Sequence, residues 1–470
     1  MSYFSIEFAL LLLAFFMLYW AWGKAYQIQN LLLLAFNYLI ICLLSPYFAI
    51  VLFVFTCLVY FLALVIDTAR VRFIFICCVL IVVLYLCFFK YYALIKDEFD
   101  ALLAFIGLSL SVDIVFPLGL SFYTFASITY LRAVYEGAQS EVDDTHYQEG
   151  NPAFEGFFAL ATYLSFFPTL LAGPIMRSHF FFEQYHRIRT FGHIDEIIVL
   201  ILFGVVKKAL IANYLEIYSS PILQNPSEHH ILELITGICA YSVQLYCDFS
   251  GYVNLVCAFA LMLGFSLPPN FNMPYMAKNL KDFWSRWHIS LSTFIRDFIY
   301  IPLGGNRKGF LNAQIFVLIA FTLSGLWHGN TLNFMLWGLL HGLGLVVLNC
   351  LRQIDFSLEG VPFLGSLITF IFVTFCWIFF YYPSFDEALE FFSACANGFN
   401  ADFAYQDWLI LACFLVVFMV YPFMRGFMDL CVKISSLVHW TLKPFVLAAI
   451  FTLLVGMMPQ GIPNFIYASF

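Results

Sequence analysis

Apolar runs of about 20 residues recur along the whole chain, and they constrain its fold more than any other feature. A helix of that length spans the hydrocarbon core of a bilayer, which is about 30 Å thick. The sequence is 63% hydrophobic and 11% charged, whereas soluble domains are about 25% charged. The chain therefore lacks the polar surface of a soluble multidomain enzyme. We expect an all-α polytopic membrane protein embedded in the lipid bilayer, and we exclude disordered and nucleic-acid-binding proteins.

Two of the apolar runs are too long for a single crossing. Run 231–265 must tilt, break near Gly251 or cross twice, because a helix of 35 residues is about 52 Å long. Run 311–350 is expected to break around the segment 329–331 (Gly-Asn-Thr). In total we expect about 11 to 14 transmembrane or re-entrant helices. The spans are expected near residues 4–22, 30–46, 48–66, 73–89, 114–134, 155–174, 194–212, 231–265, 311–350, 362–381, 404–424 and 441–459.

The basic residues predict the orientation, because lysine and arginine favour cytoplasmic loops. Both ends of the chain lie outside if the weak run 101–112 also crosses. Residues 444–470 carry no charged side chain, so we expect an extracytoplasmic C-terminus. The first run ends without a clear cleavage site and is expected to remain as a membrane helix. The clusters that we expect in the cytoplasm are Lys24, Arg70 and Arg72; Arg177, Arg187 and Arg189; Arg307 and Lys308; and Arg425, Lys433 and Lys443.

The chain is expected to have three parts: N-terminal transmembrane helices in 1–112, a core in 113–350 and C-terminal transmembrane helices in 351–470. Within the core, segment 278–291 carries too many charges to face lipid, so it should lie along the interface or line a water-filled recess. A surface amphipathic helix anchored at lipid headgroups would explain this segment equally well. The 13 cysteines show no spacing typical of a metal site, and we expect no metal.

Most of the ten histidines fall in predicted loops or at span ends, but His328 lies inside the apolar run 311–350. An ionisable group inside a membrane is costly and by default functional. The alternative is a core histidine whose hydrogen bonds are satisfied. His341 shares the run, but thirteen helical residues rotate it about 220° away from His328. Packing against Gly338 or Gly342 would explain His341.

The order of several motifs resembles the membrane-bound O-acyltransferase family, in its bacterial branch of cell-surface polymer acyltransferases. The resemblance covers roughly residues 110–350 and implies a helical fold around a central funnel. The motifs are 117–125 (PLGLSFYTF), 171–175 (LAGPI), 248–252 (DFSGY), 270–275 (NFNMPY), 282–291 (DFWSRWHISL) and 326–329 (LWHG).

The resemblance also implies roles for individual residues. His328 occupies the position of the family's essential Trp-His-Gly histidine, and His288 matches the histidine of the family's Trp-His-x-Ser segment. We assign His288 a supporting role, in binding or polarising the acyl group. Asp248 could orient the central histidine or stabilise a break in the long span, and we favour the second role. Arg286 could lie in the wall of the funnel or anchor the chain at the membrane surface. The residues expected at the substrate are Trp327, Trp287, Arg286, Asp248 and Asn330.

Residues 465–470 match the Phe-x-Tyr-x-x-Phe ending of similar acetyltransferases, whose tyrosine is proposed to carry the acyl group. Tyr467 takes that position. Phenol and imidazole differ by about 3.5 pKa units, so complete proton transfer to His328 would cost about 4.8 kcal/mol. We therefore expect His328 to act as a general base in concert with attack by the Tyr467 oxygen on acetyl-CoA. The alternative is an aromatic tail that anchors the chain at the interface.

Together these features predict an enzyme of the bacterial inner membrane that passes acetyl groups from cytoplasmic acetyl-CoA to an extracytoplasmic polysaccharide, with peptidoglycan favoured. No bound cofactor is expected. By resemblance, the partner would be an extracytoplasmic acetyltransferase of the SGNH-hydrolase type. The alternatives are acetylation of alginate or another exopolysaccharide, D-alanylation of teichoic acid, a scaffold subunit and, from a different class, a secondary transporter.

Overall fold

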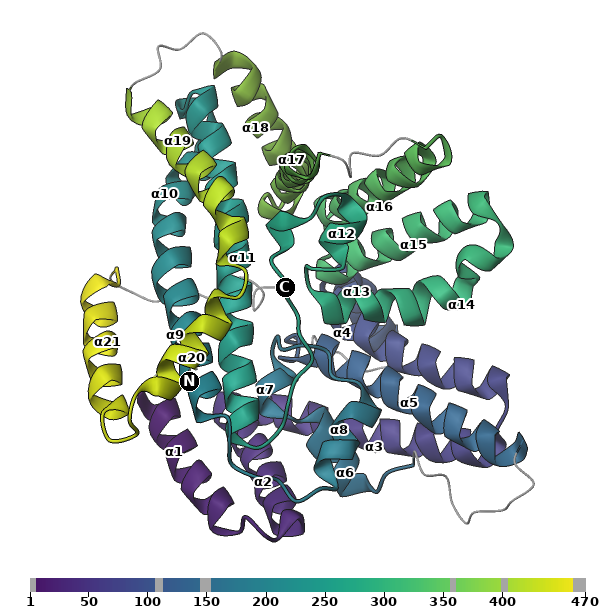
Figure 1. Ribbon diagram of the computed structural model, residues 1–470. Helices are drawn as coiled ribbons and strands as arrows, with labels where there is room; N and C mark the ends of the chain where they lie inside the picture. Colours follow the sequence, from purple (N-terminus) through teal and green to yellow (C-terminus); the bar gives the residue numbers. More distant parts are fainter. Residues whose placement is uncertain (1–5, 106–112, 144–153, 356–360, 399–404, 460–470) are drawn as a thin grey trace. The chain divides into compact units, whose positions relative to one another are not determined.

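The computed structural model describes the chain apart from residues 1–5, 106–112, 144–153, 356–360, 399–404 and 460–470 (Figure 1). Every regular element in the described part is helical, which confirms the all-α expectation. The chain divides into two compact units. Unit 1 comprises residues 1–192 and 259–268, and unit 2 comprises residues 193–258 and 269–470.

Unit 1 contains the first eight α-helices. Helix α3 packs against α2, α4 and α5, and it begins with Pro46, a residue suited to the first helical turn because its missing N–H needs no partner there. The weak run 101–112 does not start a helix of its own, because its described part, up to Phe105, continues α4. The bounds are α1 Ile6–Ala21, α2 Tyr26–Leu44, α3 Pro46–Ala69, α4 Arg72–Phe105, α5 Leu120–Asp143, α6 Phe157–Leu164, α7 Phe167–Leu170 and α8 Ser178–Tyr185.

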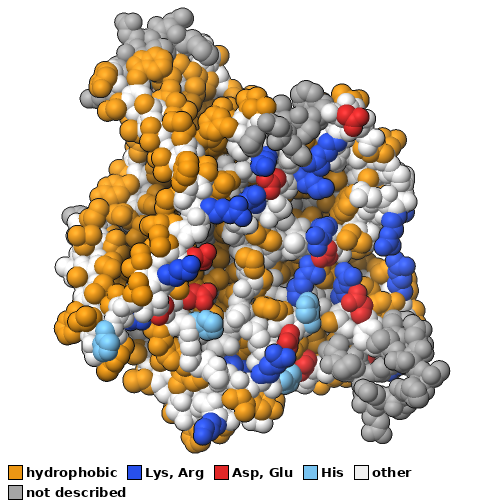
Figure 2. All heavy atoms as spheres, in the orientation of Figure 1, with side chains coloured by type: hydrophobic (Ala, Val, Ile, Leu, Met, Phe, Trp, Pro, Cys, Tyr) orange, Lys and Arg blue, Asp and Glu red, His pale blue; other side chains and the backbone are white. Residues whose placement is uncertain are grey.

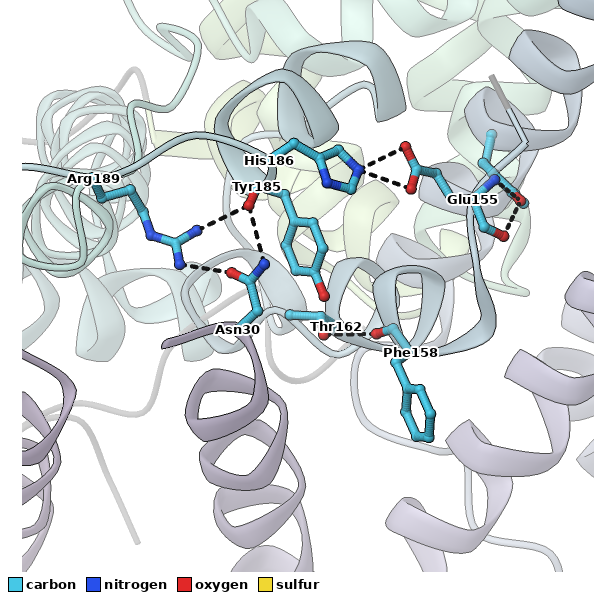
Figure 3. Close-up of polar contacts among 8 residues, drawn as sticks. Asn30, Glu155, Phe158, Thr162, Tyr185, His186 and Arg189 are labelled. Atoms are coloured by element: carbon cyan, nitrogen blue, oxygen red, sulfur yellow. Dashed lines mark hydrogen bonds and ion pairs between the residues drawn. The ribbon is translucent and has the colours of Figure 1, made fainter. Parts of the chain in front are cut away.

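A polar network inside unit 1 holds one of the arginines that we expected in a cytoplasmic loop (Figure 3). Arg189 is only 4% exposed and donates to the side-chain oxygen of Asn30 at 2.6 Å. The Asn30 amide in turn donates to the carbonyl of Tyr185 at 3.1 Å, and the guanidinium lies 4.9 Å from the centre of the Phe265 ring. Arg189 therefore ties α2 to the segment after α8 instead of projecting into water.

Unit 2 contains the remaining helices and most of α11. Its π-helical segments are Val206–Ala212 and Arg296–Tyr300, and its short 3₁₀ segments are Pro226–Glu228, Pro274–Met276, Gly305–Lys308 and Tyr421–Met424. The α-helices are α9 Ile194–Val205, α10 Asn213–Gln224, α11 Ile231–Met262, α12 Leu280–Trp284, α13 Ile289–Ile295, α14 Ile301–Leu303, α15 Phe310–His328, α16 Leu332–Gln353, α17 Pro362–Tyr381, α18 Phe385–Asn397, α19 Tyr405–Val420, α20 Phe427–Leu437 and α21 Lys443–Met457.

Within the described residues, seven helices are long and apolar enough to cross a membrane: α2, α3, α4, α11, α15, α16 and α17. An eighth span results if the bent pair 408–424 and 427–437 counts as one, and α1 and α21 are apolar but shorter. The expected single span 155–174 is wrong, because the chain leaves the helix at Ser165 between α6 and α7. The Ser165 hydroxyl bonds back to the carbonyl of Ala161 at 2.6 Å.

Helix α11 runs without interruption over 32 residues, so the possible break near Gly251 is wrong. Gly251 instead permits a close helix contact. A Cβ atom there would lie 3.0 Å from the carbonyl oxygen of Gly204 and 3.0 Å from the backbone nitrogen of Lys208. At about 48 Å, the helix exceeds the hydrocarbon core and must tilt or project beyond it.

The surface of unit 2 separates apolar from charged side chains (Figure 2). Large apolar side chains are exposed on α19 and α21, among them Leu415 at 49% and Phe445 at 74%. Exposed apolar helix faces of this kind suit contact with lipid tails. Lys and Arg side chains gather around the region that Figure 1 labels α12, where the sequence carries its polar segment.

Candidate active site

The candidate site is built on the hairpin of α15 and α16 in unit 2, which lie side by side (Figure 1). The expected break at 329–331 is confirmed, since α15 ends at His328 and α16 begins at Leu332. Glycines allow the two helices to touch: a Cβ on Gly325 would lie 2.2 Å from the carbonyl oxygen of Phe334, and one on Gly338 would lie 2.2 Å from that of Phe321. Such small residues permit close helix packing in membranes.

His328 sits at the closed end of this hairpin with 3% of its surface exposed. Its ring lies 5.0 Å from that of Trp337 and 5.2 Å from that of Phe380, both edge to face. Position 329, the glycine of the Trp-His-Gly motif, has no room for a side chain, because a Cβ there would lie 2.3 Å from the Phe334 ring. The motif therefore fixes His328 within an aromatic enclosure formed by α16 and α17.

Trp327 and Asn330 flank His328 on the hairpin. The Trp327 ring is half-buried and lies 4.6 Å from the His328 ring, whereas Asn330 is exposed in the turn. Trp327 thus lies next to the histidine, and Asn330 is accessible at the end of the hairpin.

His288 lies between α12 and α13, outside the membrane-spanning helices, and is 1% exposed. It adopts a left-handed backbone conformation with φ 43°, which is uncommon for a non-glycine residue and clusters at functional sites. Asn270 Oδ1 accepts from Ser290 N at 3.2 Å, so the oxygen faces His288, whose Nδ1 lies 3.1 Å away. His288 Nδ1 therefore carries the proton and Nε2 the lone pair. Burial lowers the pKa of His288 to about 3, so its ring is neutral at physiological pH.

Aromatic rings connect the surroundings of the two histidines. The Phe249 ring lies 4.9 Å from His288 and 5.0 Å from Phe271. Trp287 lies 5.2 Å from Phe271 and 5.2 Å from Trp377. Trp377 lies 5.7 Å from Trp337, the ring that packs on His328. Trp287, which we expected at the substrate, is 1% exposed and lies at the centre of this packing.

His341 belongs to the same aromatic cluster, which the sequence analysis missed. Its ring lies 5.0 Å from Trp337 and 5.0 Å from Trp284, so Trp337 contacts both His341 and His328. The rotation of 220° assumed one continuous helix and fails across the break. In the part of the chain that the structure describes, neither nitrogen of the fully buried His341 ring has a hydrogen-bond partner.

Asp248 forms an ion pair with Lys208, which lies in the π-helical segment Val206–Ala212. Both side chains are only 3% exposed. The alternative that Asp248 stabilises a break in its own helix is therefore wrong, since the helix is continuous and the carboxylate binds a neighbouring segment. A pairing between residues 40 positions apart leaves no local signal in the sequence.

Arg286 closes the loop between 270 and 288. Its Nε donates to Asp282 at 2.8 Å and its Nη1 donates to the carbonyl of Asn272 at 3.2 Å. The backbone nitrogen of Asn272 donates back to the carbonyl of Arg286 at 2.9 Å. These contacts position the loop that carries Asn270 and His288.

Tyr467, the expected acyl carrier, lies outside the described residues. Within the described ranges, no group of three or more His, Cys, Asp or Glu side chains could hold a metal ion.

The sequence of the chain also matches a known protein family. The profile of the MBOAT, membrane-bound O-acyltransferase family matches residues 101–385. The matched range contains His288, His328 and His341.

Several named proteins are similar to the chain. The probable alginate O-acetylase AlgI of Pseudomonas putida is 34% identical over 326 residues, which cover 68% of this chain and 62% of that protein. The peptidoglycan O-acetyltransferase of Helicobacter pylori is 33% identical over 303 residues, 60% of this chain and 56% of that protein. The teichoic acid D-alanyltransferase of Bacillus subtilis is 28% identical over 277 residues, 55% of this chain and 67% of that protein. The chain thus spans less than two thirds of the length of the first two.

Proposed function

The chain belongs to the membrane-bound O-acyltransferase family, and from this membership we propose that it transfers an acyl group to a hydroxyl of a cell-surface polysaccharide. The observation that carries the proposal is His328, an ionisable side chain enclosed by aromatic rings at the end of a membrane-spanning helix. Such a group is costly in a membrane unless it has a function.

The proposed donor is acetyl-CoA, and the proposed carrier is Tyr467. The phenol oxygen attacks the thioester carbonyl while His328 takes its proton, the carbon–sulfur bond breaks, and the CoA thiolate leaves and is then protonated. The resulting aryl ester passes its acetyl group to a second hydroxyl and regenerates the phenol. A phenoxide is a far better leaving group than an alkoxide, because phenol has a pKa near 10 and water one of 15.7.

We assign His288 a supporting role in binding the acyl donor rather than in polarising its carbonyl oxygen. Its Nε2 carries the lone pair, since Nδ1 donates to Asn270. A neutral ring with that tautomer accepts a hydrogen bond from the donor's amide or from an ordered water and so positions the thioester. The roles of Trp327, Arg286, Asp248 and Asn330 in binding substrate belong to the same proposal, although Arg286 and Asp248 have partners within the fold.

Peptidoglycan is the acceptor that we favour, and alginate or a related exopolysaccharide is the second candidate. The second has a specific observation in its favour, because the probable alginate O-acetylase of Pseudomonas putida matches 68% of this chain at 34% identity. In either case the acceptor is presented outside the inner membrane by a partner acetyltransferase of the SGNH-hydrolase type. Transfer to that acceptor requires Tyr467 to reach the same side of the membrane.

Expression of the full chain in a bacterial host whose own polymer O-acetyltransferase genes are deleted tests this function. We expect alkali to release acetate from the purified peptidoglycan of cells that carry the chain with its partner, and not from cells that carry His328→Ala. If alkali releases acetate only from the exopolysaccharide fraction, the acceptor is an exopolysaccharide and not peptidoglycan. Equal acetate from the His328→Ala cells would contradict the proposed mechanism.

A further inference from the structure

Helix α21 is the last helix of the described chain, and little apolar packing holds it against the rest of unit 2. Of its 15 residues, all of which the structure describes, only Leu454 is buried. Large side chains such as Phe445 and Val455 are 74% and 66% exposed. The helix contacts the π-helical segment Val206–Ala212, which joins α9 to α10 without a break in the helical backbone. The polar contacts at the two ends of α21 therefore contribute much of what fixes its position.

The first end of α21 is held by Asp195, which lies in the first turn of α9. Its Oδ1 accepts from Lys443 Nζ, at the start of α21, at 2.6 Å and from Ser435 Oγ, near the end of α20, at 2.5 Å. The side chains of the ion pair are 17% and 25% exposed, and a hydrogen bond between two charged groups is stronger than one between neutral groups. One carboxylate thus ties together the start of α9, the end of α20 and the start of α21.

The second end of α21 is held by Tyr214, which lies in the first turn of α10. Its phenol donates to the carbonyl of Met457, the last residue of α21, at 2.8 Å. The last four carbonyls of a helix have no partner within the helix, so this hydroxyl provides one of them with a donor. Tyr214 is 52% exposed, so packing in a buried core does not explain why a tyrosine stands there.

These two contacts set the direction in which the chain leaves α21. The helix meets its first partner at the start of α9 and its second at the start of α10, so it runs parallel to this continuous helical stretch. The end of α10 lies next to the segment after α17, since the Leu223 carbonyl accepts from the Tyr382 hydroxyl at 2.7 Å. The Tyr382 carbonyl accepts from Asn333 Nδ2, in the first turn of α16, at 2.8 Å. The chain therefore leaves α21 in the direction of the hairpin turn that carries His328.

The chain after Met457 is long enough to pass the end of α10. Nine residues separate Tyr214 from Leu223, which is a rise of about 13.5 Å along the helix. Ten residues separate Met457 from Tyr467, and ten extended residues span at most about 33 to 36 Å. This length leaves about 20 Å for the lateral step from α10 to the hairpin. An anchor at Tyr214 is therefore compatible with contact between Tyr467 and His328.

We propose that Tyr214 is a positioning residue for the acyl carrier: its hydrogen bond to Met457, together with the ion pair at the other end, makes α21 a fixed base from which Tyr467 reaches His328. This inference rests on the proposed function, because it assumes that Tyr467 receives the acyl group. A tethered group meets its target more often when the tether starts from a defined point at a suitable distance. Tyr214 does not touch the reacting atoms, so its loss slows acyl transfer and leaves binding of the donor unchanged.

The test is Tyr214→Phe, which removes the hydrogen-bond donor and keeps the ring, in the purified full chain in nanodiscs. We expect amide hydrogen exchange in the last turn of α21, residues 454–458, to become about two- to tenfold faster, the range that loss of one hydrogen bond gives. The maximal rate at which Tyr467 becomes acetylated should fall by a similar factor, while the acetyl-CoA concentration that gives half of that rate stays within about twofold. The matched control is Tyr405→Phe, which alters an exposed tyrosine at the start of α19 and should change none of these quantities.

Three results would overturn the proposal. Equal exchange in the native chain and Tyr214→Phe would show that the hydroxyl does not hold α21. Faster exchange with an unchanged rate of acetylation would show that the anchor does not position the carrier. An equal effect of Tyr405→Phe would assign the loss to the lipid contacts of exposed tyrosines. The proposed function fails separately: faster exchange in Tyr214→Phe, in a protein whose native form carries no acetyl group on Tyr467, would refute the tyrosine carrier and leave the anchor itself in place.

Discussion

His288 donates through Nδ1 to the side-chain oxygen of Asn270 at 3.1 Å. The same oxygen accepts from the backbone nitrogen of Ser290 at 3.2 Å and from its hydroxyl at 2.7 Å. One amide thus fixes the tautomer of His288 and the start of α13. This relationship places the lone pair of the imidazole on Nε2, so that atom can accept a hydrogen bond but cannot donate one to a carbonyl oxygen.

Asn270→Ala removes all three of these hydrogen bonds. Because a buried hydrogen bond contributes about 0.5 to 1.5 kcal/mol, we expect a loss of stability of about 1.5 to 4.5 kcal/mol and a lower acyl-transfer rate. Thermal unfolding in detergent and a CoA-release assay measure the two effects. Asn272→Ala is the matched control, since only the backbone of the exposed Asn272 makes contacts in the loop. Equal effects of the two substitutions would disprove the role of Asn270.

The stability of the protein should fall in acid because of His288. The pKa of this histidine is about 3 in the fold, below its ordinary value of 6.5, so between these values the unfolded chain binds a proton that the folded chain excludes. The contribution is fully present above pH 6.5 and decreases by about 1.4 kcal/mol per unit as the pH falls towards 3. Unfolding measured at pH 7.5 and pH 5.0 should show a smaller drop for His288→Gln than for the native chain. The same drop in both would contradict a buried neutral histidine.

The buried pair of Lys208 and Asp248 gives a prediction on folding. Removing one partner leaves an uncompensated charge and costs about 3 to 5 kcal/mol. We therefore expect Asp248→Leu and Lys208→Met each to destabilise the protein strongly, and the double variant Lys208→Met, Asp248→Leu to be more stable than the sum of the single changes indicates. Thermal unfolding of the four proteins measures the coupling. Simple additivity would show that the two groups do not interact.

Glycines 325 and 338 should not tolerate even a methyl group. A Cβ at either position lies 2.2 Å from a carbonyl oxygen of the other helix, so Gly338→Ala must separate α15 from α16 and displace His328. We expect loss of activity and a lower unfolding temperature. Gly456→Ala in α21 is the control, because no atom lies within 4 Å of its Cβ position. In a helix, that change should raise stability slightly. A Gly338→Ala protein with native activity would contradict the close contact.

Some features of the fold follow from local sequence. The apolar runs predict membrane helices because the hydrophobicity of a residue does not depend on its distant neighbours. The turn at 329–331 is predicted by a glycine next to polar residues. A long run was harder to interpret. Gly251 was interpreted as a possible break in α11, but it instead allows α11 to pack closely against Gly204. This contact is visible only in the folded structure.

The candidate site shows the same division. His328 could be found from its place in an apolar run, and His288 from the resemblance, while His341 was misjudged because a rotation angle does not carry across a turn. The partner of Asp248 and the burial of Arg189 depend on residues far away in sequence. The preference of arginines for cytoplasmic loops does not take into account a buried arginine such as Arg189, which is bound by Asn30.

Intact mass spectrometry of the purified chain after incubation with acetyl-CoA tests the central claim most directly. The account predicts one added acetyl group on the peptide that contains Tyr467, absent in Tyr467→Phe and in His328→Ala. Tyr405→Phe, an exposed tyrosine at the start of α19, is the control and should still become acetylated on Tyr467. If a supplied polymer becomes acetylated and CoA is released at the native rate while no acetyl group is found on the protein, the tyrosine carrier is contradicted. Equal acetylation of the His328→Ala chain would contradict the catalytic base.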